Sequence, residues 1–404
     1  MTSNTRVVVI GAGLAGVRLA RRLGELGTPV TLVGDEEHRP YNRVLLAEVL
    51  AGHYSPEVIA LPAPAELTRG RVTAVDRAAR AVRLADGSVI GYGTLVLATG
   101  SNPVLPPLRG LFTPDRVLPE GVHAFRTMDD CLGLSRAVRP GVRAVVIGGG
   151  LLGVSAARAL ALRGAQVVLA QQSERLMERQ LDPDASRLVR RHLTGLGVEV
   201  HTDLRVRDVR CADGAVRSVE MADGYALDAD LVVLACGVRP RTGLARAAGL
   251  EVGRGVVVDG ELRTSDPYVR AVGDCAEHAG TVYGLAAPAL EQADVLAALL
   301  AGDPNARYTG TRSLTRLTLV GRGGPLDLAA FGETEARPGD DVVRLADATR
   351  GTYRKVVVRG DRLVGGVLVG ELGTVGALAR AWEGAEPLPD GGPLLHLLTN
   401  DGGS

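Results

Sequence analysis

The chain has 404 residues, which is enough for two or three domains with sizeable cores. It carries 46 basic and 46 acidic residues, and this zero net charge gives no support for binding to nucleic acid or to an anionic membrane. No apolar run approaches the roughly 20 residues that span a bilayer, and the first apolar strand begins too early to leave room for a signal peptide. We therefore expect a cytoplasmic protein with neither kind of partner.

Residues 6–33 predict a strand, a glycine-rich turn, a helix and a second strand. The turn glycines permit a tight bend and let backbone amides approach a pyrophosphate, and the helix N-terminus adds a partial positive charge. The acid that ends the second strand, Asp35 or Glu36, should accept hydrogen bonds from ribose hydroxyls. The residues expected to hold this first nucleotide are Gly11, Gly13, Leu14, Ala15 and Gly16.

A further apolar strand over 94–98 ends in Ala98, Thr99 and Gly100. The proline-rich stretch at 103–107 follows directly, and it is typical of a crossing point between domains.

The same fingerprint recurs 137 residues later, from Gly148 onward. It again lies between two apolar strands, and a partner strand ends at Gly237, mirroring the first half. Two copies in one register predict two dinucleotides in one chain, usually a flavin and a nicotinamide. The second set of candidate residues is Gly148, Gly150, Leu151, Leu152, Gly153, Gln171, Gln172 and Gly237.

The last third of the chain predicts one more apolar strand at 269–272, ending in Gly273 and Asp274, and a helix that ends at Leu300. If that strand joins the first fingerprint, the second unit is inserted into the first. From about residue 310 short alternating strands follow, with a hairpin around Gly360 and a helix near 373–384. We expect an α/β protein with a double Rossmann fold and a small C-terminal α+β domain. The predicted domains are 1–115 with 240–309 for FAD, 116–239 for NAD(P), and 310–404.

Cysteines and histidines give no sign of a metal site. The four cysteines form no C-x-x-C or C-x-x-x-x-C pair, and the histidines lack ligand spacing, so we expect no zinc site, iron–sulfur cluster or redox disulfide.

Several longer motifs resemble the pyridine nucleotide-dependent flavoprotein reductases with a glutathione-reductase-like double Rossmann fold. The resemblance runs from residue 6 to about 390 and is most similar to the N-terminal FAD/NADH module of the NADH-dependent nitrite reductase large subunit. Nitrate-assimilation electron-transfer subunits and rubredoxin reductases look similar. The motifs that carry it are Tyr41-Asn-Arg43, Gly149-Gly150-Leu-Leu-Gly153, Arg175-Leu-Met-Glu-Arg-Gln-Leu181-Asp182, Ala271-Val-Gly273-Asp274-Cys275, Tyr283-Gly-Leu-Ala-Ala-Pro288 and Thr352-Tyr353-Arg-Lys355.

The resemblance implies roles for particular residues. Arg43 would face the FAD phosphates, Thr99 and Gly100 would close over the flavin nucleotide, and Asp274 would bind the ribityl chain. The helix that follows would point its N-terminus at the flavin and stabilise negative charge there. The other residues implied to contact FAD are Ala98, Gly273, Leu285, Ala286 and Pro288.

The chain also departs from the family pattern. No cysteine lies in 38–48, where disulfide reductases carry a thiol, and Glu48 stands about where the oxygenase-coupled ferredoxin reductases have a lysine. Ser155 replaces a usual glutamate, and Gln171 and Gln172 stand where an acid usually holds the NADH ribose. We therefore expect binding of NADH and NADPH to be weak, unselective or absent.

These observations predict an FAD-dependent NAD(P)H:acceptor oxidoreductase without a redox-active disulfide, and no side-chain acid or base can be named. Hydride would pass from NADH or NADPH to FAD, and electrons would leave to an iron–sulfur protein, a rubredoxin-like protein or a nitrate- or nitrite-reducing partner. Two alternatives stay open. One is a flavoprotein oxidase or tailoring enzyme that has lost NAD(P)H use, and the other is a non-catalytic interaction protein with bound FAD.

Overall fold

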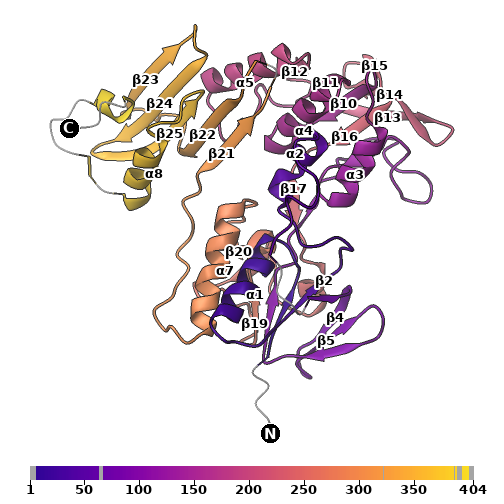
Figure 1. The fold of residues 1–404 in the computed structure, drawn as a ribbon, viewed down its shortest axis with the longest axis vertical. Coiled ribbons are helices and arrows are strands. Elements are labelled where there is room, and N and C mark those ends of the chain that lie inside the picture. The colour runs from indigo at the N-terminus through magenta and orange to yellow at the C-terminus, as the bar shows by residue number, and fades with distance from the viewer. Residues whose placement is uncertain (1–5, 63–66, 322, 386, 389–393, 400–404) are drawn as a thin grey trace. The chain divides into compact units, whose positions relative to one another are not determined.

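The computed structural model describes residues 6–62, 67–321, 323–385, 387–388 and 394–399, and these form two compact units (Figure 1). The chain passes from unit 1 to unit 2 between Val104 and Leu105, inside the predicted proline-rich crossing. The division into three domains stays a prediction, because residues after 311 belong to the same compact unit as the second fingerprint. Unit 1 comprises Met1–Val104, Arg126–Met128 and Val238–Thr311, and unit 2 comprises Leu105–Phe125, Asp129–Gly237 and Arg312–Ser404.

Unit 1 is built around a parallel sheet in the order β19-β7-β1-β2-β3. Because β19 pairs with β7 in this sheet, the strand before Asp274 belongs with the first fingerprint, as the insertion model requires. Its strands are β1 (Val7–Ile10), β2 (Val30–Gly34), β3 (Leu67–Arg69), β7 (Thr94–Leu97) and β19 (Val269–Ala271).

Burial explains why this sheet forms where the sequence predicts it. All four residues of β1 are buried, as expected for a central parallel strand covered on both faces. Helix α1 (Leu14–Glu25) turns one apolar face inward and packs against α7 (Ala286–Leu300), and the two lie side by side in Figure 1 (indigo and orange). The remaining elements of unit 1 are η1 (Arg43–Leu45), α2 (Leu46–Leu50), β4 (Val72–Asp76), β5 (Ala81–Leu84), β6 (Val89–Gly91), β8 (Ser101–Pro103), β17 (Val238–Pro240), α6 (Gly243–Ala247), β18 (Val256–Val258), η2 (Gly273–Cys275) and β20 (Ala276–His278).

Unit 2 contains a second parallel sheet, in the order β12-β11-β10-β16-β9. Its central strand is again the one that precedes a glycine turn, so the two halves share one design. The elements of this part are β9 (Val122–Ala124), α3 (Met128–Ala137), β10 (Arg143–Ile147), α4 (Leu151–Leu162), β11 (Gln166–Ala170), α5 (Pro183–Gly195), β12 (Glu199–His201), β13 (Val206–Ala212), β14 (Ala215–Met221), β15 (Ala226–Asp228) and β16 (Leu231–Leu234).

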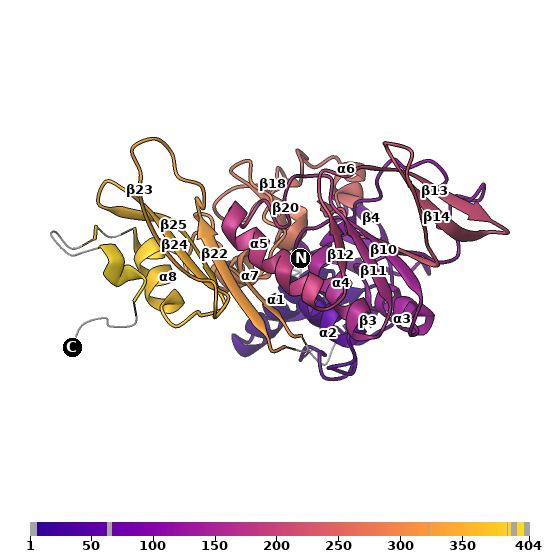
Figure 2. The same ribbon diagram turned by 90° about the horizontal axis from the view of Figure 1, so that it is seen from above.

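The rest of unit 2 is an antiparallel sheet with helix α8 packed against it (Figure 2). The predicted hairpin around Gly360 is confirmed, because β24 pairs with β25 in antiparallel register. The predicted helix is also present, as α8, and it packs on β22 and β25. The elements are β21 (Thr315–Leu319), β22 (Leu326–Gly332), β23 (Asp341–Asp347), β24 (Thr352–Arg359), β25 (Arg362–Val369), α8 (Val375–Gly384) and η3 (Leu394–Leu397).

A buried polar cluster joins α5 to this antiparallel sheet. Asp182 caps α5 by accepting from the Ala185 amide at 3.0 Å, and its other oxygen accepts from the Tyr353 hydroxyl at 2.6 Å and the Lys355 ammonium at 2.9 Å. All three side chains are buried, and Lys355 is the only lysine in the chain. Since the carboxylate has three donors, the cost of burying its charge is offset. The cluster joins two of the motifs that carry the family resemblance.

Candidate functional site

The first glycine turn follows β1 and leads into α1. Gly11 has φ +113°, and a Cβ on it would lie 2.1 Å from the carbonyl oxygen of Ala98. A Cβ on Gly16 would lie 1.9 Å from the oxygen of Gly11, so both positions require glycine for steric reasons. Gly13 differs, because it has φ −84° and a Cβ there would meet only Arg43 Nη2, at 4.0 Å. The space above Gly13 is therefore open, at the N-terminus of α1.

A cluster of charged and polar side chains lies where β2 ends. Glu36 accepts from Arg43 Nη2 at 2.9 Å and from the Tyr41 hydroxyl at 2.5 Å. Burial opposes ionisation of Glu36, but Arg43 and the Tyr41 hydroxyl outweigh it and hold the pKa of this carboxyl below its usual value. Asp35 is exposed at the same strand end. The two acids are thus not equivalent, because Glu36 already has an arginine partner inside the protein.

The opposite side of the site is formed by the ends of β7, β8 and η2. Asp274 Oδ2 accepts from Ser101 Oγ at 2.8 Å and from Arg126 Nη2 at 2.6 Å. Burial lowers the pKa of the Arg126 guanidinium, and its pairing with Asp274 counters part of that effect. Thr99 donates through Oγ1 to the Arg241 carbonyl at 2.9 Å, which ties the β7 strand end to the segment after β17.

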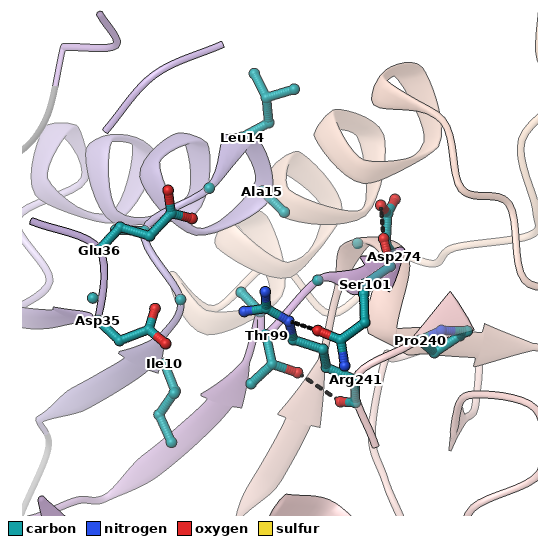
Figure 3. Close-up of a pocket in the computed structure, with 18 of the residues that line it drawn as sticks. Ile10, Leu14, Ala15, Asp35, Glu36, Thr99, Ser101, Pro240, Arg241 and Asp274 are labelled. Atoms are coloured by element: carbon teal, nitrogen blue, oxygen red, sulfur yellow. Dashed lines mark hydrogen bonds between the residues drawn. The ribbon is translucent and has the colours of Figure 1, made fainter. Parts of the chain in front are cut away.

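A single cavity of about 1300 Å³ connects these two sides (Figure 3). Asp35 and Glu36 lie at one end and Ser101 and Asp274 at the other (Figure 3). The predicted residues that line it are Gly11, Gly13, Leu14, Ala15, Asp35, Glu36, Arg43, Ala98, Thr99, Gly100, Gly273, Asp274, Leu285 and Ala286.

Two predicted residues do not line this cavity. Gly16 instead lets α1 pack closely on the turn, and Pro288 is buried in the first turn of α7. The site analysis of the sequence also missed residues that line it, among them Tyr41, Ser101 and Arg126. The Tyr41-Asn-Arg43 motif contained a signal for the first, whereas Arg126 comes from a segment far along the chain and had no local signal.

The cavity fits FAD on three grounds. It exceeds the roughly 300–1000 Å³ of ordinary small-molecule pockets, as a dinucleotide requires. The open space above Gly13 lies at a helix N-terminus, which suits a pyrophosphate. Arg43 and Arg126 supply guanidinium groups at the cavity wall, and such groups bind phosphate oxygens well.

The second glycine turn, in unit 2, repeats this backbone. Gly148 has φ +108°, a Cβ on Gly153 would lie 1.7 Å from the Gly148 oxygen, and nothing lies within 4 Å of a Cβ on Gly150. Leu151 and Leu152 form the first turn of α4, and Gly237 has φ +97° just after β16. The arrangement is that of a second dinucleotide turn.

Side chains at this second turn are neutral. Gln171 is buried, and its Oε1 accepts from the Gly149 amide at 2.7 Å, so it lies beneath the turn. Gln172 is exposed. Ser155 donates to the Leu151 carbonyl of its own helix at 2.8 Å. The three departures from the family pattern thus leave the second turn without a carboxylate at these positions.

The four cysteines are all free, and none is arranged as a thiol relay. Cys275 is fully buried and donates to the carbonyls of Leu97 and Val272. Burial raises the pKa of Cys131 and that of Cys236 to about 11, so neither thiol is activated. In the described ranges, no group of three or more His, Cys, Asp or Glu side chains could hold a metal ion.

These features define a protein with two dinucleotide-type glycine turns, and comparison with known proteins gives its family. Residues 5–293 match the model of the pyridine nucleotide-disulphide oxidoreductases, and residues 320–383 match the C-terminal domain of rubredoxin NAD+ reductase. The chain belongs to the pyridine nucleotide-disulphide oxidoreductase family, and it has the predicted α/β fold.

Individual relatives agree with this assignment. The assimilatory nitrate reductase electron transfer subunit of Bacillus subtilis is 34% identical, over 91% of this chain and 48% of its own length. The rubredoxin-NAD(+) reductase of Alcanivorax borkumensis is 31% identical, over 76% of this chain and 82% of its own. Among solved structures, the covalent putidaredoxin reductase–putidaredoxin complex matches with a TM-score of 0.85 and 27% identity, covering 98% of this chain and 99% of that one.

The chain spans about half the length of the nitrate and nitrite reductase relatives it matches. Across the residues that the structure describes, no helix is both long and apolar enough to cross a membrane.

Proposed function

We propose that the protein takes a hydride from NADH or NADPH, bound at the second glycine turn, and passes electrons through FAD, bound at the first, to a redox protein. FAD, when bound, supplies the chemistry that converts a two-electron donor into single electrons for an acceptor. The observation that supports this proposal is the pair of glycine turns with one backbone geometry, one of which opens into a cavity large enough for a dinucleotide.

Residues of this chain would do the binding and positioning. The amides at the start of α1 and the Arg43 guanidinium would hold the pyrophosphate, and Asp35 would accept from the adenosine ribose, because it is exposed at the strand end and Glu36 is paired with Arg43. Asp274, held by Ser101 and Arg126, would accept from a ribityl hydroxyl. No side chain is assigned as an acid or a base.

The acceptor is proposed to be a small iron–sulfur or rubredoxin-like carrier, or a nitrate- or nitrite-reducing partner. The names of the relatives support this choice, and the free, unactivated cysteines support direct transfer without a thiol intermediate. We further propose that the protein works in the cytoplasm, where NAD(P)H is supplied. Cell fractionation with an antibody to the protein checks the location.

Anaerobic titration of the flavin-loaded protein with NADH and with NADPH tests the function. We expect the visible band of oxidised flavin to bleach with at least one donor, and a one-electron iron–sulfur acceptor to restore it faster than oxygen does. A Gly150→Val variant, which places a side chain in the open space of the second turn, should keep FAD and lose the bleaching.

The neutral second turn favours one further candidate, a flavoprotein oxidase or tailoring enzyme that no longer uses a pyridine nucleotide. Gln171, Gln172 and Ser155 stand where carboxylates would be expected, and this is the observation behind that candidate. Full FAD content with no bleaching by either donor would favour it over the reductase.

A further inference from the structure

A short segment of unit 1, Arg126–Met128, reaches the cavity wall through Arg126, and we call it the strap. The residues before and after the strap belong to unit 2, whereas these three residues belong to unit 1. Side-chain contacts hold the strap in place from its two ends. Arg126 binds Asp274 and Ser101, and its carbonyl accepts from Arg43 Nη1 at 3.3 Å.

The other end of the strap is held by one tyrosine hydroxyl. The backbone N–H of Met128 donates to the Tyr41 oxygen at 2.9 Å, and the Tyr41 hydroxyl donates to Glu36 at 2.5 Å. Tyr41 is only 4% exposed, so water cannot replace either bond readily. One hydroxyl therefore connects the acid at the end of β2 to the strap that carries Arg126.

Charge strengthens this connection. Arg43 and Tyr41 keep Glu36 ionised, and burial beside that carboxylate raises the pKa of Tyr41, so the tyrosine stays a donor. A hydroxyl that donates to a carboxylate becomes a better acceptor, so the bond from Met128 gains from the one to Glu36. Arg43 also lies over the Tyr41 ring, with its guanidinium carbon 5.2 Å from the ring centroid.

The local fold places Tyr41 firmly. Asn42 donates through its amide to the Ile59 carbonyl at 2.8 Å, and its side chain accepts from the Val44 amide at 3.1 Å, which caps η1. On the other side of the tyrosine, the Pro40 carbonyl accepts from the Leu61 amide at 2.7 Å. The residues on both sides are thus held by bonds that do not involve the cofactor, so the hydroxyl can be in position before FAD arrives.

From this geometry we infer that Tyr41 is a positioning residue that preorganises the FAD site by holding the strap, and through it Arg126, in the conformation that the cofactor needs. The inference rests on the proposed binding of FAD in this cavity. Without the hydroxyl, the buried Met128 N–H loses its acceptor and Glu36 loses one of its donors. The strap is then less ordered in the apoprotein, and part of the free energy of FAD binding is spent on ordering it.

Tyr41→Phe tests the inference, and Tyr92→Phe is the matched control. Tyr92 lies in the core of the same unit, is 1% exposed and does not line the cavity, so the control removes a hydroxyl from an equally buried ring. FAD release is measured on the holoproteins by dilution and ultrafiltration, and exchange of the Met128 amide by hydrogen–deuterium exchange.

We expect Tyr41→Phe to weaken FAD binding by about 10- to 100-fold and to speed exchange at Met128, while Tyr92→Phe changes neither. Tyr41→Phe and Glu36→Gln should also be non-additive in FAD affinity, because the first removes and the second weakens the same bond, from the Tyr41 hydroxyl to residue 36. A Tyr41→Phe protein that melts earlier but matches the control in FAD affinity and Met128 exchange would overturn the inference. Failure of the wild-type protein to bind FAD would instead overturn the proposed function.

Discussion

The two glycine turns share one backbone geometry, but the side chain that fills the space beneath each turn comes from a different position. In each, the first glycine has φ near +110°, at +113° and +108°, and the third glycine packs directly on the first. Beneath the first turn lie Ala12 and Gly34, where a Cβ on Gly34 would meet the Ala12 Cβ at 2.8 Å. Beneath the second lie Gly149 and Gln171, where a Cβ on Gly149 would meet the Gln171 Cβ at 3.1 Å.

This exchange of a small and a larger residue between the two positions separates the steric requirements of the motif from its chemical ones. Strand-to-helix geometry demands the glycines at both turns, so they are the same. The space beneath the turn accepts only one side chain from either of two positions, and that choice sets the local polarity. At the first turn the acids Asp35 and Glu36 follow the strand and do not lie beneath the turn. At the second turn the Gln171 side chain lies beneath the turn and Gln172 is exposed.

The largest expected effect comes from a side chain on the middle glycine of each turn. Gly13 and Gly150 have φ −84° and −76°, and their Cβ positions are open, so valine should fit the apoprotein in both places. We expect Gly13→Val to lower FAD affinity by more than about a hundredfold, because the methyls take the place of the pyrophosphate and its amide bonds are lost. Gly150→Val should spare FAD and abolish NAD(P)H binding.

Visible flavin absorbance of the purified variants, with circular dichroism as the control for folding, separates the two turns. Full flavin in Gly13→Val, or flavin loss confined to Gly150→Val, would contradict the assignment of the cofactors to the turns.

A second test gives the second turn the residues that lie beneath the first. Gly149→Ala pushes a methyl against Gln171 and Leu176, and such overpacking costs about 1–3 kcal/mol. Gln171→Gly removes the acceptor of the Gly149 amide, which costs a similar amount, about 1–3 kcal/mol. The double variant recreates the Ala/Gly filling of the first turn, so we expect it to be more stable than the sum of the single losses implies. Urea unfolding of unit 2 gives the three free energies, and strict additivity would mean that the two side chains do not share one space.

A third test concerns coenzyme choice. The offset of 137 residues maps Asp35 onto Gln172, which is exposed as Asp35 is. We expect the wild-type protein to discriminate little between NADH and NADPH, because an amide neither binds a ribose hydroxyl with charge nor repels a 2′-phosphate. Gln172→Glu should favour NADH by about tenfold, the worth of a charged hydrogen bond.

Gln171→Glu tests the neighbouring register, since glutamate there keeps an acceptor for the Gly149 amide and adds charge. The ratio of dissociation constants for NADH and NADPH is the measurement. A wild-type preference above about a hundredfold, or no shift in either variant, would show that this loop does not contact the ribose.

The sequence predicted the features that are local in the chain and missed those that depend on distant segments. Both turns and the β24–β25 hairpin follow from periodicity and glycine placement, whereas the pairing of β19 with the first sheet was stated only as a condition. Arg126 and Ser101 could not be found in this way, because their partner Asp274 is 148 and 173 residues away. The orientation of Gln171 was also hidden, because a residue that ends a strand can face the ligand or the turn.

The smallest expected effect is a difference in pH dependence between the two strand ends. At the first strand end, burial raises the pKa of Glu36, but Arg43 and Tyr41 together lower it further and hold it below its usual value. At the second strand end, Gln171 does not titrate. A carboxyl with a lowered folded-state pKa contributes stability that is fully present above its unfolded value of about 4.3 and is lost as the pH falls through the folded value. Glu36→Gln should therefore unfold at lower urea than wild type at pH 7, and the gap should narrow steadily below about pH 4.3. Gln171→Asn shortens a side chain beside the other glycine turn and changes no titrating group. The difference in urea midpoint between this variant and wild type should therefore not change with pH. The prediction concerns how the difference in urea midpoint between Glu36→Gln and wild type changes with pH. A difference that stays constant with pH would mean that this carboxyl stabilises the protein by packing and not by its charge.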